Sequence, residues 1–247
     1  QIPPPHIYIA DGSSGNLVCT LNTSNGTINT CGPHTGGNYY APFDFDYVLG
    51  SLSQMYVATG VNVANCPINL STGALSCGGA AGGLSQAKKV RIHNTASGLF
   101  AYLIASNGIN ACPISTTNGY PGTCQVTNSG LTVPVAGQST TTANWYPNAI
   151  DFFTAGNSST YAYVIESHTS GGIFKCNVNN TTGLLSACAA VTPAGMPANY
   201  GIYGLTNIKI FSIGSSTYAY MALASQGVVK CSVDATTGAL SSCAASN

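Results

Sequence analysis

Ten cysteines fall into five pairs of nearly constant spacing along this 247-residue chain. Within each pair the cysteines stand 11 or 12 positions apart, and a glycine follows the first cysteine by seven positions. A β-hairpin explains this spacing, because two short strands joined by a glycine-bearing turn bring the cysteines within disulfide reach. The pattern predicts five hairpin disulfides: Cys19–Cys31, Cys66–Cys77, Cys112–Cys124, Cys176–Cys188 and Cys231–Cys243.

The cysteine pattern also predicts the cellular compartment. Structural zinc sites favour two cysteines separated by only a few residues, and this sequence has none of that kind, so we expect no metal and no other cofactor. Disulfides persist in oxidising compartments, so the chain is expected to be secreted, on the cell surface or periplasmic. No signal peptide precedes Gln1, which predicts a chain that is already processed.

The cysteine hairpin is half of a larger repeat. A short aromatic–aliphatic segment precedes each pair, and a segment of alternating apolar residues precedes four of those five. The first cysteines of successive repeats stand 46 to 64 residues apart. Repeats of this length, with four short strands each, are typical of β-propeller blades. We therefore predict one all-β domain, a five-bladed β-propeller with about four antiparallel strands and one hairpin disulfide in each blade. The expected blades cover residues 1–31, 43–77, 88–124, 148–188 and 206–243.

Two repeats carry a resemblance to a known family. Residues 56–77 contain Tyr-Val-Ala, Cys-Pro-Ile-Asn and Thr-Gly-Ala-Leu-Ser-Cys, and residues 219–243 repeat this order with small changes. These units resemble the YVTN-type repeats of bacterial and archaeal surface proteins and of lactonase-like β-propellers, with a disulfide added to each blade. The resemblance implies the propeller fold but little about function, because propellers host many unrelated activities. The tachylectin-2 type of lectin is similar only in its blade number.

The first blade departs from the repeat. Its inner strand would have to come from residues 1–5, of which three are prolines, and proline cannot donate a hydrogen bond within a central strand. One interpretation is a reduced first blade of three strands in a closed monomer, which we prefer because folds keep sheet edges short and protected. The alternative is that another segment, such as a strand of a neighbouring subunit, completes the sheet.

Charged residues are rare and unevenly placed. They make up 5% of the chain, with six cations and six anions, too few for a nucleic-acid-binding patch. No apolar run reaches the length of a membrane helix. One phase of the expected inner strands is apolar and includes Phe45 and Tyr47. The other phase carries most of the polar character: Asp44, Asp46, Lys89, Arg91, His93, Asp151 and Lys209. Ion pairs between adjacent blades explain this better than a polar channel pocket, in which Asp44 and Asp46 would bind a cation.

Aromatic residues gather in the expected links between blades, which is where propellers often bind ligands. They are Tyr39, Tyr40, Trp145, Tyr146, Tyr200 and Tyr203. Rings beside Asn, Ser and Thr suit carbohydrate, although they could equally cover the ends of the blades. Six sequons mark candidate glycosylation sites in a eukaryotic protein: Asn22, Asn25, Asn69, Asn157, Asn179 and Asn180.

These features favour a non-enzymatic extracellular module that binds glycan or another surface. A structural subunit that assembles with itself into a filament or surface layer is the alternative, since zero net charge favours association. A lactonase-like enzyme or a glycoside hydrolase ranks last. It would need convergent carboxylates, for which only Asp44, Asp46 and Asp151 qualify, with His93 as a base. No catalytic residues are therefore assigned.

Overall fold

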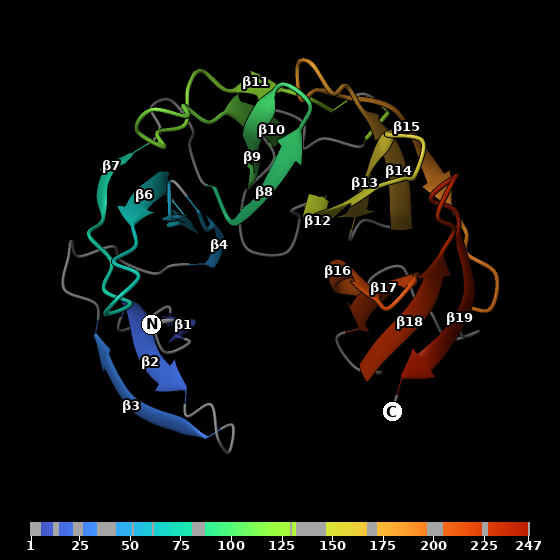
Figure 1. Ribbon diagram of the computed structural model, residues 1–247. Coiled ribbons are helices and arrows are strands. Elements are labelled where there is room, and N and C mark those ends of the chain that lie inside the picture. Colours follow the sequence, from blue (N-terminus) through green and yellow to red (C-terminus); the bar gives the residue numbers. More distant parts are fainter. Residues whose placement is uncertain are drawn as a thin grey trace. The chain divides into compact units, whose positions relative to one another are not determined.

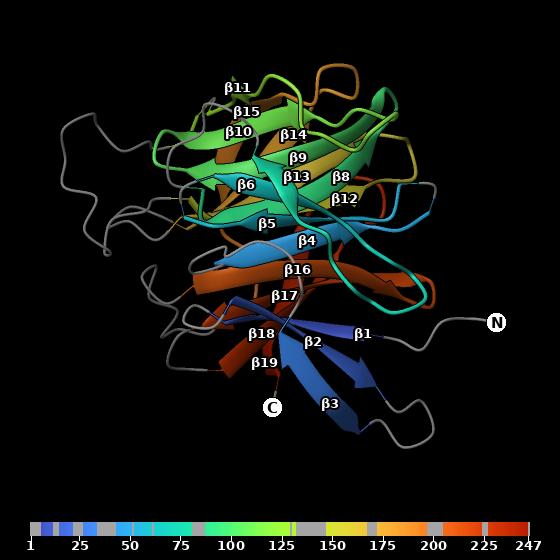
Figure 2. The same cartoon turned by 90° about the vertical axis from the view of Figure 1, so that its left-hand side faces the viewer.

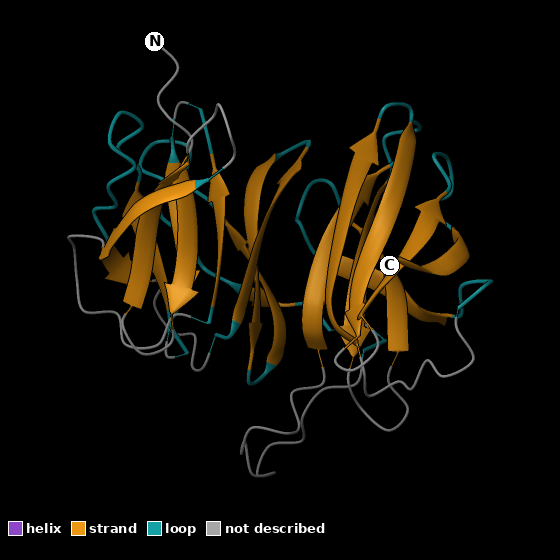
Figure 3. Ribbon diagram, turned by 90° about the horizontal axis from the view of Figure 1, so that it is seen from below, coloured by secondary structure: helices purple, strands orange, loops and turns teal. Residues whose placement is uncertain are grey.

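The computed structural model describes residues 6–11, 15–21, 27–33, 43–50, 52–60, 62–80, 87–128, 130–131, 147–166, 172–196, 205–223 and 227–246. All regular structure in these segments is β-strand, as Figure 3 shows. Nothing in this described part of the chain is a helix long and apolar enough to cross a membrane.

The strands form five sheets, one for each predicted blade (Figure 1). The first has three strands: β1 (His6–Asp11), β2 (Gly15–Leu21) and β3 (Ile28–Pro33). The second has β4 (Asp44–Val48), β5 (Gln54–Ala58), β6 (Val63–Pro67) and β7 (Gly78–Ala80). The third has β8 (Lys89–Thr95), β9 (Gly98–Ala105), β10 (Gly108–Pro113) and β11 (Gln125–Val126).

The fourth and fifth sheets have the longest strands. The fourth contains β12 (Pro147–Thr154), β13 (Thr160–Glu166), β14 (Gly172–Val178) and β15 (Leu185–Val191). The fifth contains β16 (Leu205–Ile213), β17 (Ser216–Leu223), β18 (Gly227–Val233) and β19 (Leu240–Ser246). Within each sheet consecutive strands are neighbours, so every blade is an antiparallel meander. The fold class is therefore the predicted one, an all-β, five-bladed propeller.

The chain divides into two compact units. The first comprises Gln1–Ile92, Gly98–Ala105 and Cys112–Cys124, and the second comprises His93–Ser97, Ser106–Ala111 and Gln125–Asn247. The division runs through the third sheet, whose strands contribute to both units. Each unit is described by itself below, and the single domain expected from the sequence stays a prediction.

The first blade is the reduced one. Strand β1 pairs with β2, with Tyr8 opposite Val18, and the sheet ends there among the described residues (Figure 2). In the second blade the corresponding tyrosine, Tyr56, lies on the second strand, and it pairs with Asp46 of the inner strand β4. Strand β1 therefore occupies the second position of its blade, and the described residues supply no inner strand.

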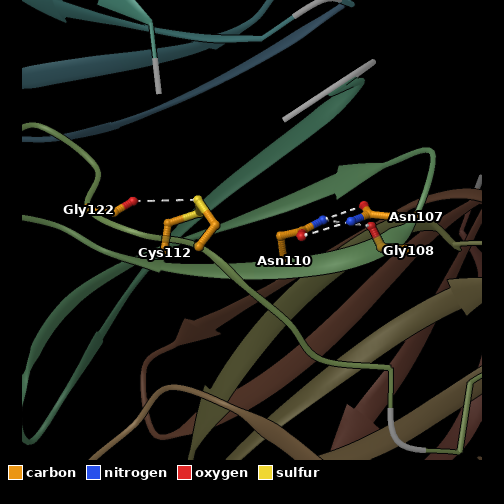
Figure 4. Close-up of a disulfide and its surroundings, with 6 residues drawn as sticks. Asn107, Gly108, Asn110, Cys112 and Gly122 are labelled. Atoms are coloured by element: carbon orange, nitrogen blue, oxygen red, sulfur yellow. Dashed lines mark hydrogen bonds between the residues drawn. A yellow bond between two sulfur atoms is a disulfide. The ribbon is translucent and has the colours of Figure 1, made fainter. Parts of the chain in front are cut away.

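All five predicted disulfides are present. Each joins the two outer strands or their extensions, with the paired Cα atoms 3.9–4.1 Å apart. Figure 4 shows the Cys112–Cys124 disulfide of the third blade, with Cys124 Sγ 3.7 Å from the Gly122 carbonyl oxygen. It also shows a reciprocal amide pair between Asn107 and Asn110. In the fourth and fifth blades Ala187 and Ser242, just before the second cysteine, have positive φ and mark a β-bulge.

A tyrosine on the second strand bonds each described blade to the next one within its unit. Tyr8 Oη donates to the Gly73 carbonyl at 3.1 Å, and Tyr56 Oη donates to the Gly119 carbonyl at 2.9 Å. In the second unit Tyr163 Oη donates to the Gly238 carbonyl in the same way. Each acceptor is the glycine that follows a cysteine by seven positions. The repeated glycine is therefore the docking point of the preceding blade.

Two constraints make glycine necessary at this turn. Gly73, Gly119 and Gly238 have φ values of +70°, +73° and +65°, which other residues rarely adopt. The side chain two positions before the tyrosine also lies against the turn: a Cβ on Gly119 would lie 2.9 Å from Gln54 Cγ. The turn thus combines a left-handed backbone with close contact from the neighbouring blade.

We predict that Tyr56→Phe lowers the free energy of unfolding by about 1–3 kcal/mol, because it leaves the Gly119 carbonyl without its donor. Gly119→Ala should cost at least about 1 kcal/mol through backbone strain alone. Chemical denaturation of the two variants measures both effects. Tyr120→Phe is the control, because Tyr120 is 45% exposed, and it should leave stability unchanged. Equal stability of Tyr56→Phe and wild type would contradict this role.

Candidate functional site

Charged side chains of the first unit join the inner strands of the second and third blades. Asp44 Oδ2 lies 2.8 Å from Arg91 Nη1 and also accepts the Val90 amide at 3.1 Å. Asp46 Oδ2 accepts the Ile92 amide at 2.8 Å. Both carboxylates are therefore committed to strand β8. Lys89, on the same strand, is half-buried.

The second unit repeats this contact between its fourth and fifth blades. Asp151 Oδ2 accepts the Ile210 amide at 2.6 Å, as Asp46 accepts the amide of Ile92. Lys209 Nζ lies 3.6 Å from Asp151 Oδ1, but the Lys209 side chain is 56% exposed, so this ion pair contributes little. In both units a carboxylate of one inner strand accepts a backbone N–H of the next inner strand, from a half-buried Asp46 in the first unit and a buried Asp151 in the second.

The charge carried by the inner strands alternates from one blade to the next. Asp46 and Asp151 pair with the second-strand tyrosines Tyr56 and Tyr163, and Lys209 pairs with Tyr220. Arg91 precedes Ile92 as Lys209 precedes Ile210, so the four inner strands carry anion, cation, anion and cation in turn. A negative blade edge thus meets a positive one wherever a unit contains both strands.

His93 lies in the second unit, where its ring stacks on Phe152 with the centroids 4.5 Å apart. Its Nε2 atom is buried and has no hydrogen-bond partner among the described residues. Burial lowers the pKa of His93 from its usual 6.5 to about 4, because desolvation disfavours the imidazolium. The imidazole is therefore uncharged at neutral pH, and its role is to pack against the Phe152 ring.

The structure brings the predicted polar residues into two groups, one in each unit. Asp44, Asp46 and Arg91 lie together in the first unit, and Asp151 lies with Lys209 in the second. The continuous polar ring around a channel stays a prediction. Within the described segments no three His, Cys, Asp or Glu side chains are placed to hold a metal ion.

Two sequence predictions about the strands and loops have different outcomes. Tyr47, assigned to the apolar phase of its strand, is 50% exposed, so that assignment is wrong for this residue. Strand β4 is followed directly by Leu49 and Gly50 at an exposed strand end, which explains the exposure. The aromatic loop residues predicted to bind ligand all lie outside the described residues: Tyr39, Tyr40, Trp145, Tyr146, Tyr200 and Tyr203.

The fifth blade carries an aromatic face that the sequence analysis did not single out. The Phe211 ring stacks on Tyr220 with the centroids 4.8 Å apart, and Lys230 Nζ lies 4.7 Å above the Tyr218 ring. Phe211 is 45% exposed. The sequence did contain a signal for this face, because a phenylalanine stands opposite a tyrosine at the same register of the fourth blade.

In the fourth blade, the corresponding face is covered by the fifth blade. Lys175 Nζ lies 3.8 Å above the Tyr161 ring and donates to the Thr237 carbonyl, beside the Tyr163 bond to Gly238. Phe153 and Tyr161 pack against the apolar core of the second unit. The face formed by Phe211, Tyr218, Tyr220 and Lys230, which we call the blade-5 aromatic face, has no such cover within that unit.

We predict that Asp151→Ala destabilises the fold by about 1.5–3 kcal/mol, because the half-buried Ile210 amide loses a charged acceptor. Lys209→Ala should change the free energy of unfolding by less than about 1 kcal/mol, because its partner contact is solvent-exposed. Denaturation of the two variants measures this contrast. A larger loss in the lysine variant would show that the ion pair, and not the backbone contact, is what matters.

The low pKa of His93 predicts acid sensitivity. The unfolded chain takes up a proton near pH 6.5 whereas the folded chain resists it down to about pH 4, so stability falls as the pH drops through this window. At pH 5 the loss due to this residue is about 2 kcal/mol. Melting temperatures at pH 7 and pH 5 should therefore converge in His93→Phe, which keeps the stacked ring. An unchanged pH dependence in this variant would refute the assignment.

Comparison with known proteins places the fold. No family model and no curated protein matches the sequence. Candidate 6-phosphogluconolactonases from Bacteroides uniformis and Bacteroides fragilis match 94% and 100% of the chain, with 17% and 13% identity and TM-scores of 0.57 and 0.56. A Lactobacillus plantarum protein matches 95% at 16% identity, with a TM-score of 0.55. The chain spans 63–67% of the length of these proteins. It thus shares the lactonase-like β-propeller fold, here built from five disulfide-bonded blades.

Proposed function

We propose that this chain is a secreted or cell-surface β-propeller that binds glycan or another extracellular surface and does not catalyse a reaction. The observation that carries the proposal is the use of the inner-strand carboxylates. Asp44, Asp46 and Asp151 each accept a backbone N–H from the next blade, so their oxygens are committed to holding strands together. A chain that uses its scarce carboxylates in this way has few groups left for acid–base chemistry.

The compartment and the composition support the same proposal. Five disulfides indicate an oxidising compartment, outside the cell or in a periplasm. An aromatic surface in a chain with 5% charged residues suits a ligand of many hydroxyl groups, because rings cover the apolar face of a sugar. Among the described residues the blade-5 aromatic face is a surface of this kind, and the predicted aromatic loops, which include Trp145 and Tyr146, stay candidates outside the described residues.

A hydrolase remains the competing enzyme class, since two of the structural neighbours are candidate 6-phosphogluconolactonases. It is disfavoured because hydrolysis needs groups that are free to act on a substrate, whereas Asp44, Asp46 and Asp151 each accept a backbone N–H of the next inner strand. We predict no acceleration of 6-phosphogluconolactone hydrolysis over buffer. Hydrolysis that is lost in Asp151→Asn, with the fold intact by circular dichroism, would overturn the non-enzymatic proposal.

A glycan array tests binding directly. We expect retention of a subset of glycans, with at least a tenfold loss of affinity in a Trp145→Ala/Tyr146→Ala variant or in Phe211→Ala, depending on which surface binds. Tyr120→Ala is the matched control, because Tyr120 is an exposed aromatic residue on a hairpin turn and belongs to neither surface. Absence of binding to any glycan, by a protein shown to be folded, would overturn the glycan part of this proposal and leave another extracellular surface as the ligand.

A second candidate function is a structural subunit that assembles with itself. The observation that favours it is strand β1, which pairs on one side with β2 and whose other edge has no described partner. An edge that has no partner among the described residues, on the strand of the 39%-exposed Ile9, can accept an extended segment of a second copy. Negative-stain electron microscopy with a native mass measurement distinguishes the cases. Ordered polymers that disappear on deletion of residues 1–5 support assembly, and particles of the monomer mass exclude it.

A further inference from the structure

The outer hairpin turns share a polar side chain at one position. Three residues after the first cysteine stand Asn69, Ser115, Asn179 and Asp234 in the four described hairpins. Each accepts the amide of the residue two positions later, with distances of 3.0, 3.3, 2.9 and 3.0 Å. A side-chain oxygen at this position therefore fixes the turn, and Asn, Ser and Asp all supply one.

Asparagine differs from the other two residues because its Nδ2 is not needed by the turn. Asn69 and Asn179 are exposed, and their Oδ1 atoms accept the turn amides while Nδ2 bonds to no described residue. Asn157, in the turn between β12 and β13, has the same arrangement, with Oδ1 accepting the Ser159 amide at 3.0 Å. All three head an Asn-x-Ser/Thr sequon.

Asn180 also heads a sequon, but its side-chain nitrogen already forms a hydrogen bond. Its Nδ2 donates to the Ser158 carbonyl at 3.0 Å, and its Oδ1 is buried without a partner among the described residues. Its backbone carbonyl also accepts from the Ser97 amide and hydroxyl. A sugar on this nitrogen would have to occupy the space between two turns that are already in contact. The two overlapping sequons at residues 179–182 are therefore not equivalent.

We propose that Asn69, Asn157 and Asn179 carry N-linked glycans and that Asn180 does not. In this modification Nδ2 forms a bond to the anomeric carbon of an oligosaccharide. The bond between that carbon and the diphosphate of a lipid-linked donor breaks, and the amide proton leaves with the diphosphate. Asn22 and Asn25 lie outside the described residues and are not part of the proposal.

The composition gives such glycans a physical role. Soluble domains usually place many charges on the surface, whereas this chain has 12 charged residues and no net charge. An exposed apolar residue lies beside one proposed site: Leu70, which is 44% exposed, follows Asn69 directly. Glycans are bulky and solubilising, so they would replace charge in keeping copies of the chain apart. Under this proposal the glycans would limit association between copies of so uncharged a chain.

Peptide mass spectrometry of the protein purified from its natural source tests the sites. We expect the peptides that contain Asn69, Asn157 and Asn179 to carry a hexose-containing mass increment, with the attachment at Asn179 and not at Asn180 after fragmentation. Unmodified peptides at the three positions, or attachment at Asn180, would overturn the proposal.

The overlapping sequons offer a matched pair of variants for the natural host. Thr181→Ala removes the sequon of Asn179 and leaves that of Asn180 intact, whereas Thr182→Ala does the reverse. We expect the first variant to lose the glycan of this turn and the second to keep it. If Thr182→Ala loses the glycan instead, the site is Asn180 and the assignment is wrong. Enzymatic or chemical removal of the glycans should also lower the solubility of the folded protein several-fold, and an unchanged solubility would remove their proposed role.

Discussion

The hydrogen bond from a second-strand tyrosine to the turn glycine of the next blade is the contact on which the rest of the structure depends. It occurs at Tyr8–Gly73, Tyr56–Gly119 and Tyr163–Gly238, and each tyrosine crosses from one sheet to its neighbour. Burial raises the pKa of Tyr56 to about 12, so the hydroxyl keeps its proton at any physiological pH. The glycine that receives the bond lies within the disulfide loop. The bridge therefore holds the acceptor in place for the donor.

The few charged residues of the inner strands also hold one blade against the next. A carboxylate on one inner strand accepts a backbone N–H of the following inner strand, at Asp46–Ile92 and again at Asp151–Ile210. Such contacts favour a rigid framework, because a buried carboxylate that lost its donors would be costly. They also reduce the number of groups available for chemistry. Function in this chain is therefore sought on its surfaces, at the turns, the loops and the blade-5 aromatic face.

Much of the fold was predictable from the sequence, because it follows from local patterns that repeat along the chain. The cysteine spacing predicted the five hairpins, and the alternating segments predicted the inner strands and the lack of one in the first blade. The tyrosine–glycine bond was not predicted, although Tyr8, Tyr56 and Tyr163 each recur 10 to 13 positions before the first cysteine of their blade. A contact between different repeats leaves no spacing signal within one repeat, so only the recurrence of both residues hints at it.

The candidate site was less predictable for a related reason. The charges on one phase of the strands predicted ion pairs between adjacent blades, and Asp44–Arg91 and Asp151–Lys209 are such pairs, but no sequence pattern identifies the backbone amides that the three carboxylates also contact. His93 appeared as a base by residue type, whereas its neighbour Phe152 makes its environment apolar. The exposed Tyr47 shows a further limit of strand periodicity. Periodicity predicts which face of the strand a residue lies on, but not where the strand reaches the edge of the blade.

Hydrogen–deuterium exchange on a Tyr163→Phe variant tests the central claim most directly. If the tyrosine bond holds the fifth blade to the fourth, loss of the hydroxyl should raise exchange at the Ile210 amide and in the hairpin between Cys231 and Cys243. Protection of strands β4, β5 and β6 in the first unit should stay as in wild type. Unchanged exchange at Ile210 and in that hairpin, or an equal rise throughout the chain, would contradict the account.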